Sequence, residues 1–362
     1  MAIAGKRFVW HSLVPGVVEI GRALFRVRRG SRVALKFILS ASFPSPTVNK
    51  LPLLLVLVML LATGCASTPP KVANPKPLIQ KLGTLDHDIV ESTPIVWHGR
   101  LYRFEWWRNE KCFRFVHAAS GKTVSTFANG YEFGTACVDR NKVYVFGTYK
   151  GGGTRIDVFW STDLKNWTSQ TALELPGWGI FNESVCRAAD RWVMAFEIDK
   201  PADETGVPFT TRFAESSDLI HWKLTPPDCV FAKDRYTACP TLRFLGGVFY
   251  MFYLESKPGW NFETCVVRSR DLIHWDSSPF NPVMRASAED KLIANERLTA
   301  GQVRQIADAV DINNSDFDLC EFGGNVVINY SWGNQRGNEF LAAALYRGTL
   351  KDFLIGWFPQ PK

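Results

Sequence analysis

Apolar strands joined by short polar turns recur along the chain. Their turns carry pairs such as His98-Gly99 and Gly246-Gly247, which suit two-residue hairpins. Each is predicted to form the inner hairpin of a larger β-unit. Residues 284–311 are charged and favour helix, so the pattern predicts a helical insertion before the last hairpin. The five hairpin segments are residues 92–106, 134–149, 183–198, 237–255 and 316–332.

The motif Ser-x-Asp-Leu-x-x-Trp occurs three times between these hairpins. The copies start at Ser161, Ser216 and Ser269, so successive copies begin 55 and 53 residues apart. A sustained period of this size, combined with strand patterning, is typical of β-propeller blades. The Ser and Asp are expected to cap a tight turn, while the Leu and Trp pack between sheets. The pattern therefore predicts an all-β fold, a five-bladed β-propeller over residues 85–358, with the helical insertion at 284–311.

An apolar run near the N-terminus ends at a cysteine. Residues 51–62 read LPLLLVLVMLLA, Lys50 precedes them, and Cys65 follows after a Thr-Gly pair. This order is typical of a signal peptide rather than a spanning helix. The cysteine resembles that of a bacterial lipobox, although Leu is more usual where Ala62 stands. The resemblance implies a diacylglycerol on Cys65 and a lipid-anchored protein of the cell envelope, on the periplasmic or outer-membrane face.

The segment before the apolar run is unusual for an exported protein. A leader that starts near Val48 looks complete, so residues 48–64 are interpreted as the signal peptide and residues 1–47 as a non-native extension. Residues 65–84 contain a polar, Pro-rich stretch and are interpreted as a linker. A plain signal peptide or a signal anchor is the alternative interpretation.

The net charge of +7 suggests a nucleic-acid partner only until its distribution is considered. Residues 1–50 hold nine of the 42 basic residues and one of the 35 acidic residues. The remainder therefore carries 33 basic and 34 acidic residues, a net charge of −1. The folded body offers no electrostatic basis for binding a polyanion, so no nucleic-acid partner is expected.

The cysteines suggest neither a disulfide framework nor a zinc site. Apart from Cys65, seven are scattered from Cys112 to Cys320 without CxxC spacing. They are interpreted as small buried hydrophobic residues, and no metal site is expected from the sequence.

The blade count, the Ser-x-Asp-Leu-x-x-Trp repeats and the strand pattern together resemble glycoside hydrolase families 43, 32 and 117. The resemblance covers roughly residues 85–355. It implies a carbohydrate substrate and hydrolysis by two carboxyl groups, one protonated acid and one base or nucleophile. No cofactor is implied, although related propellers sometimes hold a structural calcium ion in the channel.

Blade geometry indicates where such a site would lie. The inner strand of each blade starts at one face of the propeller, so these starts converge at one mouth of the channel. The positions expected at that mouth lie eight residues before each hairpin turn. Four of these five positions carry a carboxylate or stand next to one. Buried apolar strands have no structural use for so many acids. These five positions are Glu91, Phe133 (beside Glu132), Asn182 (beside Glu183), Cys239 and Asp316.

The resemblance implies a base in one blade and an acid two blades later. Glu91 and Glu183 match that spacing, so Glu183 is predicted as the general acid and Glu91 or Asp316 as the base. Asp318 follows Asp316 by two residues and is expected on the same strand face, where it would tune a pKa or hold substrate. The family's base usually precedes a proline, whereas Ser92 follows Glu91 here.

The family's acid often stands two residues before a proline, and here Ala238 holds that place before Pro240. Either the acids have moved between blades, or the protein binds carbohydrate without cleaving it. A protein-interaction scaffold is a third interpretation, which predicts a channel face without a polar pocket.

Substrate-binding candidates lie in the loops near the same mouth. Aromatic faces stack on a pyranose, while amides and guanidinium groups bind hydroxyls or a uronate. His87 lies just before the first hairpin and is a further rim candidate. The predicted binding residues are Trp332, Asn334, Gln335, Arg336, Arg235, Tyr236, Trp107, Trp260 and His87.

Overall fold

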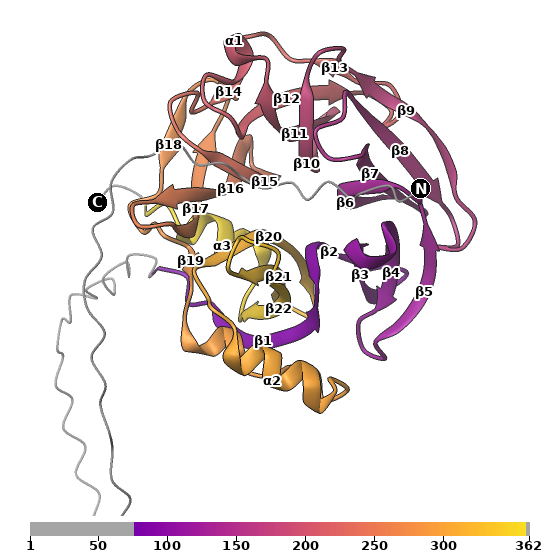
Figure 1. Cartoon of the computed structure of the whole chain (residues 1–362). Coiled ribbons are helices and arrows are strands. Elements are labelled where there is room, and N and C mark those ends of the chain that lie inside the picture. The colour runs from indigo at the N-terminus through magenta and orange to yellow at the C-terminus, as the bar shows by residue number, and fades with distance from the viewer. Residues whose placement is uncertain (1–75, 360–362) are drawn as a thin grey trace, which may run out of the picture. The chain divides into compact units, whose positions relative to one another are not determined.

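Five β-sheets arranged in a ring form the folded part of the chain (Figure 1). The structure is a computed structural model that describes residues 76–359. The five sheets correspond to the five predicted hairpins, so the prediction of a five-bladed β-propeller is confirmed. Cys65 and the predicted signal peptide lie outside the described residues, and the lipid anchor and envelope localisation stay predictions.

Each blade is an antiparallel sheet whose first two strands are one of the predicted hairpins. Blade 1 contains β2 (Ile89–Trp97), β3 (Arg100–Trp107), β4 (Cys112–His117) and β5 (Lys122–Phe127). Blade 2 contains β6 (Tyr131–Asp139), β7 (Lys142–Tyr149), β8 (Arg155–Ser161) and β9 (Thr168–Glu174). Blade 3 contains β10 (Gly179–Ala188), β11 (Arg191–Lys200), β12 (Thr210–Ser216), β13 (Lys223–Leu224) and β14 (Val230–Phe231).

The last two blades follow the same plan. Blade 4 contains β15 (Thr237–Leu245), β16 (Val248–Lys257), β17 (Asn261–Ser269), β18 (Trp275–Ser277) and β19 (Met284–Arg285). Blade 5 contains β20 (Asn313–Phe322), β21 (Asn325–Gly333), β22 (Glu339–Tyr346) and β1 (Gln80–His87). The helices are η1 (Arg108–Glu110), α1 (Ala202–Thr205), η2 (Ala288–Lys291), α2 (Ala300–Asp308) and α3 (Leu350–Gly356), of which η1 and η2 are 3₁₀-helices.

The ring is closed by a strand that the sequence pattern did not reveal. β1 pairs with β22 and completes blade 5, so the first strand within residues 76–359 lies in the last blade. The expected linker over residues 65–84 is wrong at its end, because β1 begins at Gln80. Two irregularities interrupt the register of β1, after Lys81 and after Thr84, and they hide the alternation that marks a strand.

The Ser-x-Asp-Leu-x-x-Trp repeats form capped turns, as predicted. In the second copy, Asp218 Oδ1 accepts hydrogen bonds from the backbone N–H groups of Ile220 and His221, each at 2.8 Å. Leu219 is buried, and Trp222 donates its indole N–H to the Leu219 carbonyl at 3.0 Å. The repeat therefore shapes the corner of a blade and takes no part in the channel.

Replacing Asp218 by alanine should lower the free energy of unfolding by about 0.5–1 kcal/mol, because two turn N–H groups lose their acceptor and return to water. Chemical denaturation measures this loss, with Asp203→Ala on the exposed α1 as the matched control. Any function at the channel mouth should be unchanged in Asp218→Ala, and a variant that loses it would contradict a purely structural repeat.

The predicted insertion at 284–311 is only partly helical. It contains β19, η2 and α2, and α2 begins with a capping box between Thr299 and Gln302. Figure 1 shows α2 beside blade 5, near β1. Among residues 76–359, no helix combines the length and the apolar character needed to cross a membrane.

Candidate active site

The inner strand of every blade carries a β-bulge near its start. Four residues at these bulges adopt left-handed backbone conformations although none is glycine: Phe133 (φ 49°), Asn182 (φ 28°), Cys239 (φ 50°) and Asp316 (φ 49°). A bulge adds an unpaired residue to the strand and redirects its side chain. The bulges lie between Ile89 and Ser92, Glu132 and Gly134, Phe181 and Glu183, Ala238 and Thr241, and Ser315 and Asp318.

These bulges are the positions found by counting back eight residues from each turn. Four of them, Glu91, Asn182, Cys239 and Asp316, line one pocket. The first residue that re-enters the ladder after each bulge lines it as well: Ser92, Gly134, Glu183, Thr241 and Asp318. The pocket is therefore built from two successive tiers of residues contributed by all five blades. Its volume is about 30 Å³, which suits one or two water molecules rather than a sugar ring.

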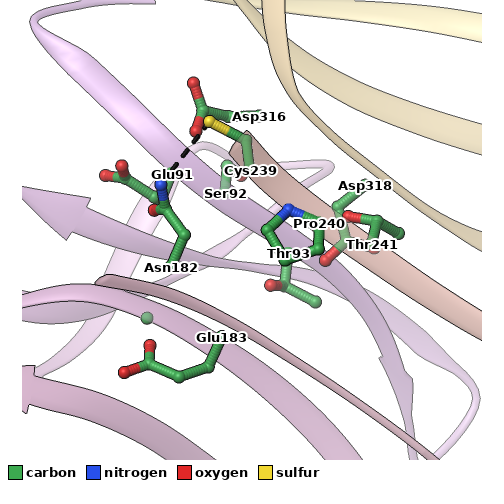
Figure 2. A pocket seen from close by; sticks show the side chains of 11 residues that line it. Glu91, Ser92, Thr93, Asn182, Glu183, Cys239, Pro240, Thr241, Asp316 and Asp318 are labelled. Atoms are coloured by element: carbon green, nitrogen blue, oxygen red, sulfur yellow. Dashed lines mark hydrogen bonds between the residues drawn. The ribbon is translucent and has the colours of Figure 1, made fainter. Parts of the chain in front are cut away.

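The first tier brings together two carboxyl groups from adjacent blades. Glu91 from blade 1 is buried, and its burial, reinforced by the nearby Asp316, raises the pKa of Glu91 well above its usual range. Asp316 from blade 5 is half-buried and accepts hydrogen bonds from the hydroxyls of Ser315 at 2.6 Å and Ser331 at 2.8 Å. Figure 2 shows both side chains on the same side of the pocket, together with Asn182 and Cys239.

The second tier places Glu183 apart from that group (Figure 2). Glu183 faces blade 2, where Thr148 Oγ1 donates to its Oε1 at 2.5 Å. Burial raises the pKa of Glu183 to about 8, so this carboxyl is protonated at neutral pH. Glu183 therefore has the protonation state of an acid, but it lies one residue deeper than Glu91.

The bulge between Asp316 and Asp318 changes their predicted relation. Asp318 is paired with blade 4, where the half-buried Arg243 forms an ion pair with it. Arg243 also donates to the Leu319 carbonyl at 2.6 Å. Both aspartates line the pocket, but the extra residue in the bulge interrupts the two-residue alternation between them, and Asp318 is paired with Arg243.

Two acidic residues near the mouth were missed from the sequence. Glu197 in β11 accepts hydrogen bonds from Asn182 Nδ2 at 2.9 Å and from the Cys239 backbone N–H at 2.8 Å. Glu339 begins β22, and its burial, with Asp316 nearby, raises its pKa to about 7. The only signal for Glu197 was an acid inside the apolar run WVMAFEI, since it stands on a second strand rather than at an inner-strand start.

Only some of the residues predicted to bind substrate at the end of β21 and in the loop after it are free to do so. Trp332 is 0% exposed, stacks on Phe340 and donates to Thr84 Oγ1 at 2.9 Å. The prediction that Trp332 binds substrate is therefore wrong, because its ring is held inside blade 5. Asn334 accepts from the backbone N–H groups of Arg336 at 2.8 Å and Asn338 at 3.2 Å, so it shapes its own loop.

The remaining residues of this loop lie closer to the mouth. Gln335 Nε2 lies 3.5 Å from Ser315 Oγ, the same hydroxyl that binds Asp316. The guanidinium group of Arg336 lies over the Trp260 ring, 5.3 Å from its centroid, and Trp260 is 45% exposed. Blade 4 and blade 5 thus meet at an exposed aromatic–cation pair.

The other predicted binding residues are engaged with neighbouring side chains. Arg235 donates to Asp234 at 3.1 Å, and Tyr236 is half-buried. Trp107 lies under the guanidinium group of Arg114, and His87 ends β1. Tyr236 belongs to a chain of aromatic rings in mutual contact, which runs from blade 1 to blade 4 through Trp106, Phe133, Phe181, Phe209, Tyr236, Phe262 and Trp260.

A calcium ion in the channel stays a prediction. Among the described residues, no group of three or more His, Cys, Asp or Glu side chains is arranged to hold a metal ion. The carboxyls that do converge interact through hydrogen bonds with Ser, Thr and Asn side chains and a backbone amide.

Solved structures with similar folds are glycoside hydrolases. A glycoside hydrolase aligns with a TM-score of 0.53 and 13% identity over 76% of this chain and 92% of its own. A mutant of a family-43 glycoside hydrolase from Bacillus licheniformis gives 0.52 and 13% identity over 74% of this chain and 54% of that longer chain. An α-L-arabinofuranosidase from Lactobacillus brevis gives 0.51 and 11%, over 73% and 93%.

This chain has the fold of these glycoside hydrolases. No protein-family model matches its sequence, and no curated protein matches it. The likeness therefore supports the propeller architecture, while the chemistry has to be argued from the pocket.

Proposed function

We propose that the protein hydrolyses glycosidic bonds with two carboxyl groups at the mouth of the propeller channel. The observation that carries this proposal is the convergence of Glu91 and Asp316 from adjacent blades on one small polar pocket. Glycoside hydrolysis needs a carboxyl that holds a proton and a second carboxyl that activates water or attacks the sugar. The fold shared with known glycoside hydrolases supports the same reaction class.

The environments of the two carboxyls suggest their roles. Burial, with Asp316 nearby, raises the pKa of Glu91 well above its usual range, so Glu91 is suited to protonate the leaving oxygen. Asp316 accepts hydrogen bonds from two serine hydroxyls, which orient it as an acceptor towards an attacking water. A pocket of about 30 Å³ has room for that water, while the sugar would lie above it at the mouth.

Glu183 is the second candidate for the acid. It is protonated at neutral pH and lines the same pocket, as the sequence analysis required of an acid in blade 3. Its hydrogen bond from Thr148 and its deeper position favour Glu91 for direct contact with a sugar at the mouth. Asn182 and Cys239 occupy the bulges of blades 3 and 4, so those first-tier positions carry no acid.

Substrate would be held by the aromatic rings around the mouth. Trp260 is the most exposed of them, and Tyr236, Phe181 and Phe133 are half-buried. Rings of this kind stack on the apolar face of a sugar while its hydroxyls bind carboxyl groups. Arg336 over Trp260 adds hydrogen-bond donors at the blade 5 side.

A carbohydrate-binding propeller without catalysis is the second candidate function. The observation that favours it is the absence of a carboxyl at the bulges of blades 3 and 4. Such a protein would keep the aromatic rim but would have no need for the raised pKa of Glu91.

Purified protein should release sugar from at least one member of a panel of arabinans, xylans, galactans and mixed oligosaccharides. Product release is measured by chromatography, with heat-denatured protein as the control. Thermal unfolding on the same panel separates the two candidate functions. A glycan that raises the melting temperature without being cleaved would replace hydrolysis by binding, and a panel with neither effect would contradict both.

A further inference from the structure

One carboxylate oxygen joins the bulges of two neighbouring blades. Glu197 Oε2 accepts a hydrogen bond from the side-chain amide of Asn182 at 2.9 Å and another from the backbone N–H of Cys239 at 2.8 Å. Asn182 is the bulge residue of blade 3, and Cys239 is the bulge residue of blade 4. Asn182 Nδ2 also lies 3.5 Å from Cys239 Sγ. Besides this direct contact, the two bulges are joined through Glu197, a residue that lies in neither inner strand.

Both bulges need such a partner. Asn182 and Cys239 have positive φ angles of 28° and 50°, a conformation that costs free energy for any residue other than glycine. The N–H of Cys239 leaves the strand ladder at the bulge and requires another acceptor. Glu197 provides it from β11, where it is 3% exposed. Its carboxyl group thus compensates for the two irregularities that shape this side of the pocket.

Once it is ionised, above about pH 7, Glu197 also adds to the negative charge at the mouth. Among the described residues it forms no ion pair, so its charge is not neutralised by a cation. Its burial, opposed by the hydrogen bonds from Cys239 and Asn182, raises its pKa to about 7. The titratable groups that interact with it are Glu91, Glu183, Asp199, Tyr236, Cys239 and Asp316.

We propose that Glu197 is a positioning residue of the channel mouth, which holds the bulges of blades 3 and 4 together and adds to the negative charge that Glu91 experiences. The first role follows from the two hydrogen bonds alone. The second rests on the proposed function, because it acts on the acid–base pair. Glu197 stands behind Asn182 and Cys239 rather than in the pocket lining, so it acts through them.

The two roles separate in two substitutions. Glu197→Gln keeps an oxygen that can accept both hydrogen bonds and removes the ionisable group. Glu197→Ala removes the acceptor and leaves the Cys239 N–H and the Asn182 amide unpaired in a buried place. Glu174→Gln, on exposed β9, is the matched control.

Thermal unfolding tests the first role without any substrate. Glu197→Ala should lower the melting temperature by roughly 3–8 °C, because two buried donors lose their acceptor. Glu197→Gln and Glu174→Gln should stay within about 2 °C of the unaltered protein at low pH. An unchanged melting temperature in Glu197→Ala would overturn the proposal that Glu197 holds the two bulges together. A Glu197→Gln variant that is as unstable as Glu197→Ala would overturn it too.

The pH dependence of stability tests the charge. The folded protein holds the proton of Glu197 up to about pH 7, whereas the unfolded chain releases it near 4.5. The stabilisation that the protonated Glu197 carboxyl contributes is therefore complete below about pH 4.5, the pKa in the unfolded chain. It is lost as pH rises through about 7, the pKa in the folded protein. Between about pH 5 and pH 8 the melting temperature of Glu197→Gln should fall less than that of the unaltered protein or Glu174→Gln. If the melting temperature falls equally in the unaltered protein, Glu197→Gln and Glu174→Gln, the proposed contribution of the Glu197 charge is overturned.

The pH profile of hydrolysis connects this charge to the reaction. Removing a like charge lets Glu91 release its proton more easily, so the alkaline limb of kcat/KM in Glu197→Gln should move to lower pH by about half a unit. An unmoved limb in an active Glu197→Gln variant would overturn the influence on Glu91. If the unaltered protein cleaves no glycan, the proposed function is contradicted. The melting temperatures still decide whether Glu197 holds the two bulges together.

Discussion

Glu91→Gln and Asp316→Asn are each expected to lower kcat/KM by roughly 10²–10⁴-fold, the loss typical of a missing general acid or base. Both replacements keep the size of the side chain and a hydrogen-bonding oxygen. In Asp316→Asn the amide oxygen can still accept from Ser315 and Ser331, so the fold should be unchanged. The loss in kcat/KM is measured from initial rates on the glycan of the panel that is cleaved fastest. Melting temperatures of the same variants show whether the fold is unchanged.

Two further variants make this test specific. Glu132→Gln removes a carboxyl beside the bulge of blade 2 that does not line the pocket, so its rate should equal that of the unaltered protein. Glu183→Gln distinguishes the two candidate acids. A loss in Glu183→Gln that matches Asp316→Asn, with Glu91→Gln still active, would transfer the acid role to Glu183. Full activity in both Glu91→Gln and Asp316→Asn would remove this pair from the mechanism.

Asp290→Ala is expected to reduce the free energy of unfolding by about 3–5 kcal/mol, the usual cost of leaving a buried charge without its partner. Asp290 is fully buried in η2 and accepts hydrogen bonds from Lys81 Nζ and from the Tyr330 hydroxyl, both at 2.7 Å. Lys81 lies on β1 and also donates to Asn314 on β20 at 2.7 Å. One carboxylate therefore ties the insertion to the strand that closes the ring.

Denaturant unfolding of Asp290→Ala beside Glu289→Ala measures this effect. Glu289 is the exposed neighbour in the same helix, so Glu289→Ala should leave the free energy of unfolding nearly unchanged. Equal stability of the two variants would show that the insertion does not hold β1 in place. Sugar release should decline in Asp290→Ala only where unfolding begins, because Asp290 is not part of the pocket lining.

Features of the fold that repeat locally are visible in the sequence alone. Each hairpin shows its own alternation and turn, and the Ser-x-Asp-Leu-x-x-Trp copies recur at nearly equal intervals. Counting back from the turns located all five bulges, because each inner strand runs a nearly constant length from its turn to the mouth. The blade count and the position of the candidate site were therefore accessible from the residues.

The ring closure was not accessible in this way. β1 pairs with β22, so Gln80 lies opposite Leu345, and no local pattern links two segments so far apart along the chain. Irregular register also weakened the alternation of β1 itself. In the folded chain β1 covers the edge of blade 5 that β22 would otherwise leave unpaired, which is a property of the assembled sheet rather than of either segment.

The residues of the site also divide into those that the local sequence predicts and those that only the tertiary structure places there. Local order along each strand determined that Glu91, Glu183 and Asp316 start inner strands, and these starts meet because the blades form a ring. The contribution of Glu197 depended on a side chain reaching across from a second strand, and the loss of Trp332 as a binding residue depended on its packing under Phe340. The surroundings of a side chain at a bulge are set by tertiary packing rather than by alternation. Asp316 and Asp318 both line the pocket, but Asp318 is paired with Arg243 from blade 4, a contact that the sequence pattern does not show.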